Sequence, residues 1–131
     1  MKRLSCVALL GICIGAAWPV FAAEPAYDAT LATKLKADDL GMRIYVMALL
    51  KAGPNRNRPP AEARALQAAH MANIDRLTAE GKLVLAGPFG DDGVLRGIYI
   101  FDVATVAAAE ALTRTDPAVQ AGQLAMELHP W

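Results

Sequence analysis

The pattern of apolar and polar positions along the chain predicts four strands and three helices. Short apolar segments bounded by turn residues predict strands at residues 42–51, 82–86, 94–102 and 123–128. Apolar side chains three or four positions apart predict helices at residues 27–40, 61–80 and 105–114. Pro60 suits the first turn of the 61–80 helix and Gly81 suits its C-terminal cap. Asp116 precedes a proline and therefore ends the last helix.

After the first helix, the elements follow the order β-α-β-β-α-β. This order is the ferredoxin-like split βαβ pattern and predicts an α+β fold. Its two helices cover one face of the sheet and leave the other face bare, including the region of Ile44 and Val46. In so small a chain we expect the bare face to pack against a second copy, which predicts a homodimer. The helix at residues 27–40, with Gly41 as its stop, is expected to be an extension outside this domain.

The first 22 residues have the order of features typical of a secretory signal peptide. Lys2 and Arg3 form a positive start, an uncharged apolar run follows, and Ala22 ends a small-residue cleavage site. The run is shorter than the ~20 residues that a membrane-spanning helix needs, which disfavours a retained anchor. A lipid-attachment box ending at Cys13 is the alternative, but Ile12 is bulky where a small residue is typical. We therefore expect cleavage after residue 22 and a periplasmic or secreted protein with no membrane attachment.

Cleavage changes the composition of the working protein. The full chain has 13 basic and 13 acidic residues, and the loss of Lys2 and Arg3 leaves a net charge of −2. The mature chain has no excess of basic residues, so its charge does not indicate nucleic-acid binding. Both cysteines, Cys6 and Cys13, leave with the signal, so we expect no disulfide and no thiol chemistry. The expected organisation is a signal peptide at 1–22, a helical extension at 23–41 and one domain at 42–131.

Several ordered motifs in this domain carry a resemblance to a known family. They are Gly53-Pro54, residues 70–74 (HMANI), residues 80–83 (EGKL), residues 86–89 (AGPF), residues 115–118 (TDPA) and Pro130-Trp131. In this order and spacing, the chain resembles the YCII-related domain family from about Met42 to Trp131. The resemblance implies a dimeric α+β barrel like that of the muconolactone-isomerase group, with a His-Asp pair beside a pocket.

Carried onto this chain, the pair implied by the resemblance is His70 and Asp116. His70 lies in the apolar stripe of the 61–80 helix, where an ionisable group needs a partner. A carboxylate on one ring nitrogen would leave the other nitrogen free as a base. A core histidine bonded to a backbone carbonyl is the alternative for His70, and a simple turn cap is the alternative for Asp116. The chain departs from the family at Ala118, where many members have an aromatic residue.

Four further residues are candidates for contact with a substrate. Asn73 lies one turn after His70, Phe89 follows a strand, and Arg56 and Arg58 lie in a proline-rich loop where they could hold an anion. We expect no metal site, because two histidines without thiols or clustered carboxylates do not form one. We also expect no cofactor.

The leading hypothesis is an exported enzyme that acts on a small organic molecule by general acid/base chemistry. Some members of the family that the chain resembles isomerise or dehalogenate small molecules such as lactones, so isomerisation, elimination or dehalogenation is implied. A metal-independent isomerase or lyase would fit a His-Asp pair. The alternative is a non-catalytic dimeric module that binds a small ligand or has a structural role.

Overall fold

The computed structural model describes residues 26–131, so the expected signal peptide and lipid-attachment box lie outside the described residues. The elements are, in order, α1 (Ala29–Leu35), β1 (Val46–Ala52), α2 (Pro60–Ala79), β2 (Leu83–Pro88), β3 (Leu95–Phe101), α3 (Val106–Thr113), α4 (Pro117–Gln120) and β4 (Leu124–Pro130). Among these residues no helix is long and apolar enough to cross a bilayer.

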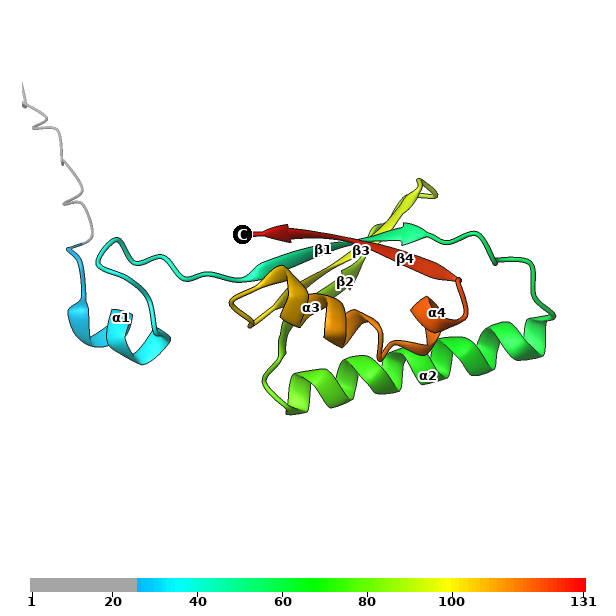
Figure 1. Ribbon diagram of the computed structural model, residues 1–131, viewed down its shortest axis with the longest axis horizontal. Helices are drawn as coiled ribbons and strands as arrows, with labels where there is room; N and C mark the ends of the chain where they lie inside the picture. The colour runs from blue at the N-terminus through cyan, green and yellow to red at the C-terminus, as the bar shows by residue number, and fades with distance from the viewer. Residues whose placement is uncertain (1–25) are drawn as a thin grey trace, which may run out of the picture.

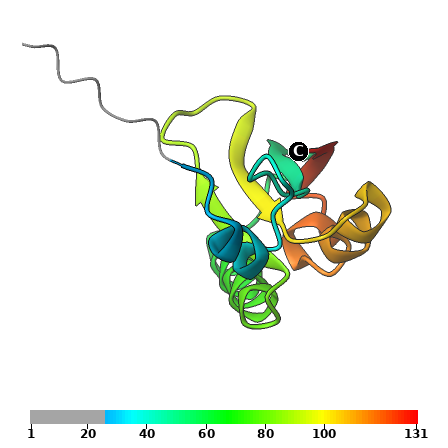
Figure 2. The same cartoon turned by 90° about the vertical axis from the view of Figure 1, so that its left-hand side faces the viewer.

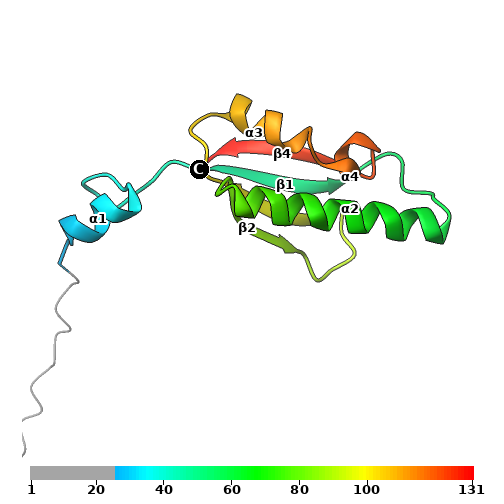
Figure 3. The same cartoon turned by 90° about the horizontal axis from the view of Figure 1, so that it is seen from below.

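The four strands form one antiparallel sheet in the order β2-β3-β1-β4. This order places β1 and β3 in the centre and confirms the α+β, ferredoxin-like fold. Figure 1 shows α2, α3 and α4 on the same side of the sheet. Seen from that side, α2 lies between β1 and β2 and contacts β2, whereas α3 and α4 lie beside β4 (Figure 3).

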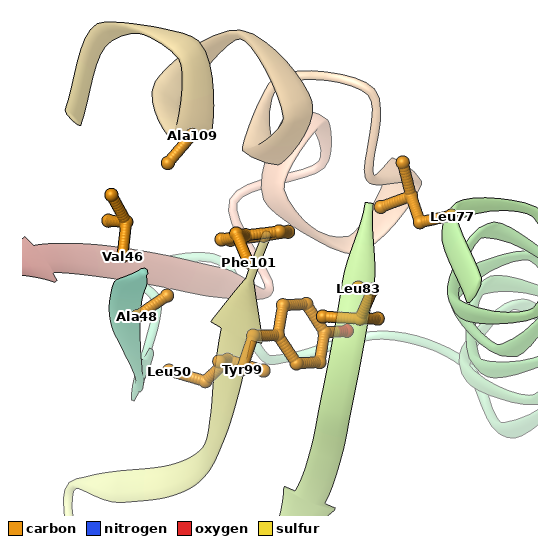
Figure 4. Packing of buried hydrophobic residues seen from close by; sticks show 8 residues of the cluster. All are labelled: Val46, Ala48, Leu50, Leu77, Leu83, Tyr99, Phe101 and Ala109. Carbon is orange, nitrogen blue, oxygen red and sulfur yellow. The ribbon is translucent and has the colours of Figure 1, made fainter. Parts of the chain in front are cut away.

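The core lies between the helices and the covered face of the sheet. Alternate residues of β1 point into it, as does Leu77 of α2. Figure 4 shows this packing, in which Tyr99 and Phe101 of β3 lie between β1 and α2. Core residues of β1, β2, β3, α2 and α3 are Val46, Ala48, Leu50, Leu77, Leu83, Tyr99, Phe101 and Ala109. Because α2 and α3 share this core, α2 and the end of α3 lie close to each other on the same face of the sheet.

Two neighbouring strands approach closely at a glycine pair. A Cβ atom added to Gly97 of β3 would lie 2.4 Å from the carbonyl oxygen of Gly87 in β2. That distance leaves no space for a side chain, so the register of β2 against β3 requires glycine there.

The first helix is shorter than the periodicity predicts. Lys36 takes a left-handed conformation with φ 56°, which ends α1 after Leu35. Gly41, expected as the stop, instead lies in a turn in which the Asp38 carboxylate accepts from the amides of Leu40 and Met42. In Figures 1 and 3, α1 stands away from the sheet and its helices, and it covers neither face. Figure 2 views the molecule from the end at which α1 lies, so that α1 is in front of the domain.

Two further expectations about element boundaries were wrong. The first strand begins at Val46, not Met42, because its partners at that position, Phe101 and Pro130, are the last residues of β3 and β4. A short helix, α4, follows Asp116 where no element was predicted, since the Asp116 side chain caps it.

The bare face of the sheet carries different β1 residues from those expected. Val46 is 1% exposed and faces the helices. Because side chains alternate along a strand, the opposite face carries Met47 and Leu49, which are half-buried. Ile44 is exposed but precedes the strand.

Candidate functional site

His70 lies on the buried face of α2. Gly81 takes a positive φ of 66° just after this helix, and the amide of Lys82 donates to the carbonyl of Leu77 there. The helix turns His70 and Leu77 toward the sheet, and His70 is only 8% exposed. A polar ring buried to this extent needs hydrogen-bond partners.

Asp116 occupies the junction between α3 and α4. Its backbone is extended, and its side-chain Oδ1 accepts from the amide of Ala118 at 2.9 Å, which caps α4. Pro117 at the first helical position suits this cap. The Asp116 residue is completely buried. The expected turn cap is therefore present, and the same carboxylate also has a second contact.

That second contact is the imidazole ring of His70. Nδ1 of His70 lies 2.8 Å from Oδ2 and 3.0 Å from Oδ1 of Asp116, although the two residues are 46 positions apart in the chain. A carboxylate only accepts hydrogen bonds, so Nδ1 donates the proton. The neutral ring then has its lone pair on Nε2. The carbonyl-bonded core histidine, considered as an alternative, is not the observed arrangement.

Tyr99 completes a buried polar group of three side chains, and the sequence patterns did not single it out. Its hydroxyl lies 3.3 Å from Nε2 of His70 and 3.4 Å from Oδ2 of Asp116. Figure 4 shows the Tyr99 ring projecting from β3 toward α2. Burial, together with the negative charge of Asp116, raises the pKa of the Tyr99 hydroxyl. The phenol therefore stays protonated at neutral pH and can donate one hydrogen bond.

A second polar cluster holds the chain next to Asp116 against α2. Arg76 Nη2 donates to Asn73 Oδ1 and to Thr115 Oγ1, both at 2.8 Å. Thr115 is the neighbour of Asp116, and its hydroxyl lies 2.7 Å from the Leu112 carbonyl oxygen. The cluster joins α2 to the end of α3, so it helps to position the carboxylate that contacts His70.

A cavity of about 390 Å³ opens beside His70. This volume is in the range of small-molecule sites in proteins. Its wall combines side chains of α2 with residues of all four strands and the loops that follow β1 and α4. The lining residues are Leu50, Arg56, Ala63, Leu66, Gln67, His70, Met71, Ile74, Ala86, Gly87, Pro88, Arg96, Gly97, Tyr99, Ala118, Gln123 and Leu124.

The four other predicted contact residues do not all reach this cavity. Arg56 lines it. Arg58 lines a separate shallow hollow and donates to the carbonyl of Ala121. Asn73 is buried in the cluster with Arg76, outside the lining. Phe89 directly follows β2, is exposed and also lies outside the lining. Ala118, which replaces an aromatic residue of the resembled family, contributes to the wall.

No group of three potential metal ligands occurs within residues 26–131. His129, the second histidine, lies on β4, where Nε2 is 2.9 Å from a Glu127 carboxylate oxygen. That carboxylate also accepts from Lys51 at 2.8 Å. The hydrogen bonds from Lys51 and His129 lower the pKa of Glu127. This exposed group lies on the sheet face opposite the cavity.

The fold and the site define a class: a small ferredoxin-like domain with a buried His-Asp pair at the wall of a cavity. The chain matches the YCII-related domain over residues 44–131, and it belongs to that family. The family resemblance seen in the sequence motifs is thereby confirmed.

Among solved structures, the chain is similar to 5-chloro-2-hydroxyhydroquinone dehydrochlorinase from Burkholderia phenoliruptrix, in complex with 2,5-dihydroxybenzoquinone. The two are 21% identical, the alignment covers 68% of this chain and 93% of the other, and the TM-score is 0.48. No match is found among the curated proteins.

Proposed function

We propose that this protein is a small enzyme in which His70 acts as a general base and acid on a small organic molecule. The observation that carries the proposal is the contact between His70 Nδ1 and the buried Asp116 carboxylate at the wall of a cavity. Membership of the YCII-related domain family supports a small-molecule site in this domain.

The chemistry follows from the orientation of the ring. Nε2 of His70 removes a proton from a carbon next to a carbonyl group, and the C–H electron pair moves toward the carbonyl oxygen. Asp116 stabilises the imidazolium that forms and keeps the ring in one tautomer. In an isomerisation, His70 returns the proton to a different carbon. In an elimination, a double bond forms and the leaving group, a halide for example, departs with its electron pair.

Tyr99 has a defined part in this scheme. Its hydroxyl is protonated and lies at the cavity wall 3.3 Å from Nε2. The hydroxyl can leave the ring and donate its hydrogen bond to the substrate oxygen, on which negative charge develops. Because burial raises the pKa of Tyr99, this group is a donor and not a base at neutral pH.

Solvent deuterium exchange tests the proposal without a known substrate. We expect the wild-type protein in deuterated buffer to exchange a C–H proton next to the carbonyl in at least one of a panel of small ketones and lactones. The His70→Gln variant should lose the exchange by about 10²–10⁴-fold, the range for a general base. NMR measures the exchange, and circular dichroism confirms the fold of the variant.

The second histidine provides a matched control. His129→Gln makes the same change on the opposite sheet face, where His129 pairs with Glu127, and should exchange at the wild-type rate. An equal rate in His70→Gln and wild type would remove His70 from the chemistry. If the wild type exchanged no member of the panel, the non-catalytic binding module would be favoured instead.

We also propose that the protein is exported and acts as a homodimer. Export is supported by Lys2, Arg3 and the uncharged run that precedes Ala22. Dimerisation is supported by the face of the sheet that carries no helix, with Met47 and Leu49 on its central strand.

A further inference from the structure

The charge of the cavity wall differs from that of the protein as a whole. Two arginines, Arg56 and Arg96, are among the lining residues, and no aspartate or glutamate is. Arg56 comes from the loop between β1 and α2, and Arg96 comes from β3. Asp116 lies behind His70 and outside the lining. Among the described residues that line the cavity, the aspartates and glutamates are absent and the formal charges of the arginines are positive.

Neither guanidinium forms an ion pair with a residue that the structure describes. Within residues 26–131, arginine ion pairs are made by Arg43, Arg76 and Arg114. Arg96 makes only a hydrogen bond to the carbonyl of Gly93, at 3.2 Å, and Arg56 makes none. Both groups thus keep donors that no described side chain pairs with, beside a concave surface that is partly apolar. A guanidinium with free donors in such a place binds carboxylates well, because its fork matches the two oxygens.

The wall of the cavity also has an apolar part. Leu66, Met71 and Ile74 extend from α2 around His70, and Leu50 and Leu124 continue the wall on the sheet. A ligand that matches both the apolar wall and the two arginines has an apolar body and a single anionic group. Its volume has to fit a cavity of about 390 Å³.

We infer that the substrate of the proposed enzyme is a small organic acid, with its carboxylate held by Arg56 and Arg96 and its reacting carbon at His70. This inference rests on the proposed function for the choice of reacting carbon. The binding of the carboxylate rests only on the two arginines and the cavity. It makes Arg56 and Arg96 specificity-determining residues, with His70 as the catalytic residue.

Two probes of equal size test the charge requirement. Phenylacetate and phenylacetamide differ in little except the negative charge, and calorimetry or NMR titration measures the dissociation constant of each. We expect saturable binding of phenylacetate at millimolar concentration and binding of phenylacetamide weaker by at least about tenfold, the effect of one charge-assisted contact. Added salt should weaken phenylacetate binding and leave the amide unaffected.

Variants locate the binding group. Arg56→Gln and Arg96→Gln should each weaken phenylacetate binding by about tenfold. Arg64→Gln is the matched control, since it removes the same charge from an exposed position of α2 outside the cavity lining. His70→Gln should still bind phenylacetate, because neither arginine depends on the ring.

The outcomes separate this inference from the proposed function. Phenylacetate binding could need both arginines while His70→Gln exchanges protons at the wild-type rate. That result would support the carboxylate site at Arg56 and Arg96 and reject His70 as the base. Equal binding of acid and amide, or an equal loss in Arg64→Gln, would overturn the acid site. So would the absence of saturable binding by phenylacetate, benzoate and phenylpropionate alike.

Discussion

At the scale of single residues, the site is a set of three buried polar side chains that satisfy one another. Asp116 is fully buried and accepts from His70 Nδ1 and from the amide of Ala118. Tyr99 is 2% exposed and reaches both partners through one hydroxyl. Burial of such groups is tolerated because each has a partner, and removal of one partner leaves another unsatisfied.

The raised pKa of Tyr99 predicts a loss of stability in alkaline solution. An unfolded tyrosine releases its proton at about pH 10, whereas folded Tyr99 retains it to a higher pH. Above about pH 10 the unfolded state therefore binds fewer protons, and the free energy of unfolding falls by up to about 1.4 kcal/mol per pH unit. Below that pH, the contribution is fully present.

Urea unfolding at a series of pH values measures this effect. In Tyr99→Phe, the free energy of unfolding should fall less steeply above about pH 10, because the contribution of Tyr99 is lost. Tyr45→Phe changes a tyrosine at the start of the sheet, outside the cavity lining, and should keep that contribution. Parallel slopes for the wild type and Tyr99→Phe would show that the hydroxyl is not held in the protonated form by folding.

At the scale of elements, the two faces of the sheet carry different groups. The face toward α2, α3 and α4 holds the core and the cavity. The opposite face has Met47 and Leu49 on β1 and, on its β4 side, the group formed by Lys51, Glu127 and His129. Since α1 lies to one side of the sheet (Figure 1), the described chain leaves this face uncovered.

A substitution on this face tests the proposed homodimer. We expect the wild type to have twice the chain mass in light scattering at micromolar concentration, with about 1,000 Å² or more buried. Leu49→Glu should give a monomer, because a buried carboxylate without a partner opposes association. Ala107→Glu, on the exposed side of α3, should stay dimeric. A monomeric wild type would contradict the proposal.

At the scale of the whole molecule, the domain from β1 to β4 contains the core and the candidate site, and α1 stands apart from it in Figures 1 and 3. Tyr27, Leu31 and Leu35, the apolar stripe of this segment, are each about half exposed. The apolar side chains of this described segment therefore contribute little to the packing of the domain.

The export proposal predicts the composition of the mature protein. Purified from a secreting host, it should begin at Ala23, carry no lipid and have a net charge of −2. Intact mass and amino-terminal sequencing measure this. The variant Ala22→Arg, which places a charge at the cleavage site, should accumulate uncut. A lipid on Cys13, or a wild-type chain that keeps Met1, would be inconsistent with simple cleavage.

Local patterns in the sequence determined the elements and the face of α2 that turns inward. Apolar spacing placed Leu66, His70, Ile74 and Leu77 on one side of a helix, and the structure confirms that side as the buried one. The element order then predicted the fold, because few topologies accommodate it. The partner of His70 was predicted from family motifs and from this topology, not from local pattern alone.

Tertiary structure decided where elements end and which side chains meet. The start of β1 depends on where β3 and β4 stop, and the end of α1 depends on the left-handed Lys36, neither of which is visible in apolar periodicity. In the sequence, Tyr99 is an ordinary strand residue, and it meets His70 only because β3 packs beneath α2. Arg96 joins Arg56 in one cavity only through the pairing of strands distant in sequence. Periodicity is a property of neighbours along the chain, whereas a site is made by contacts between distant segments.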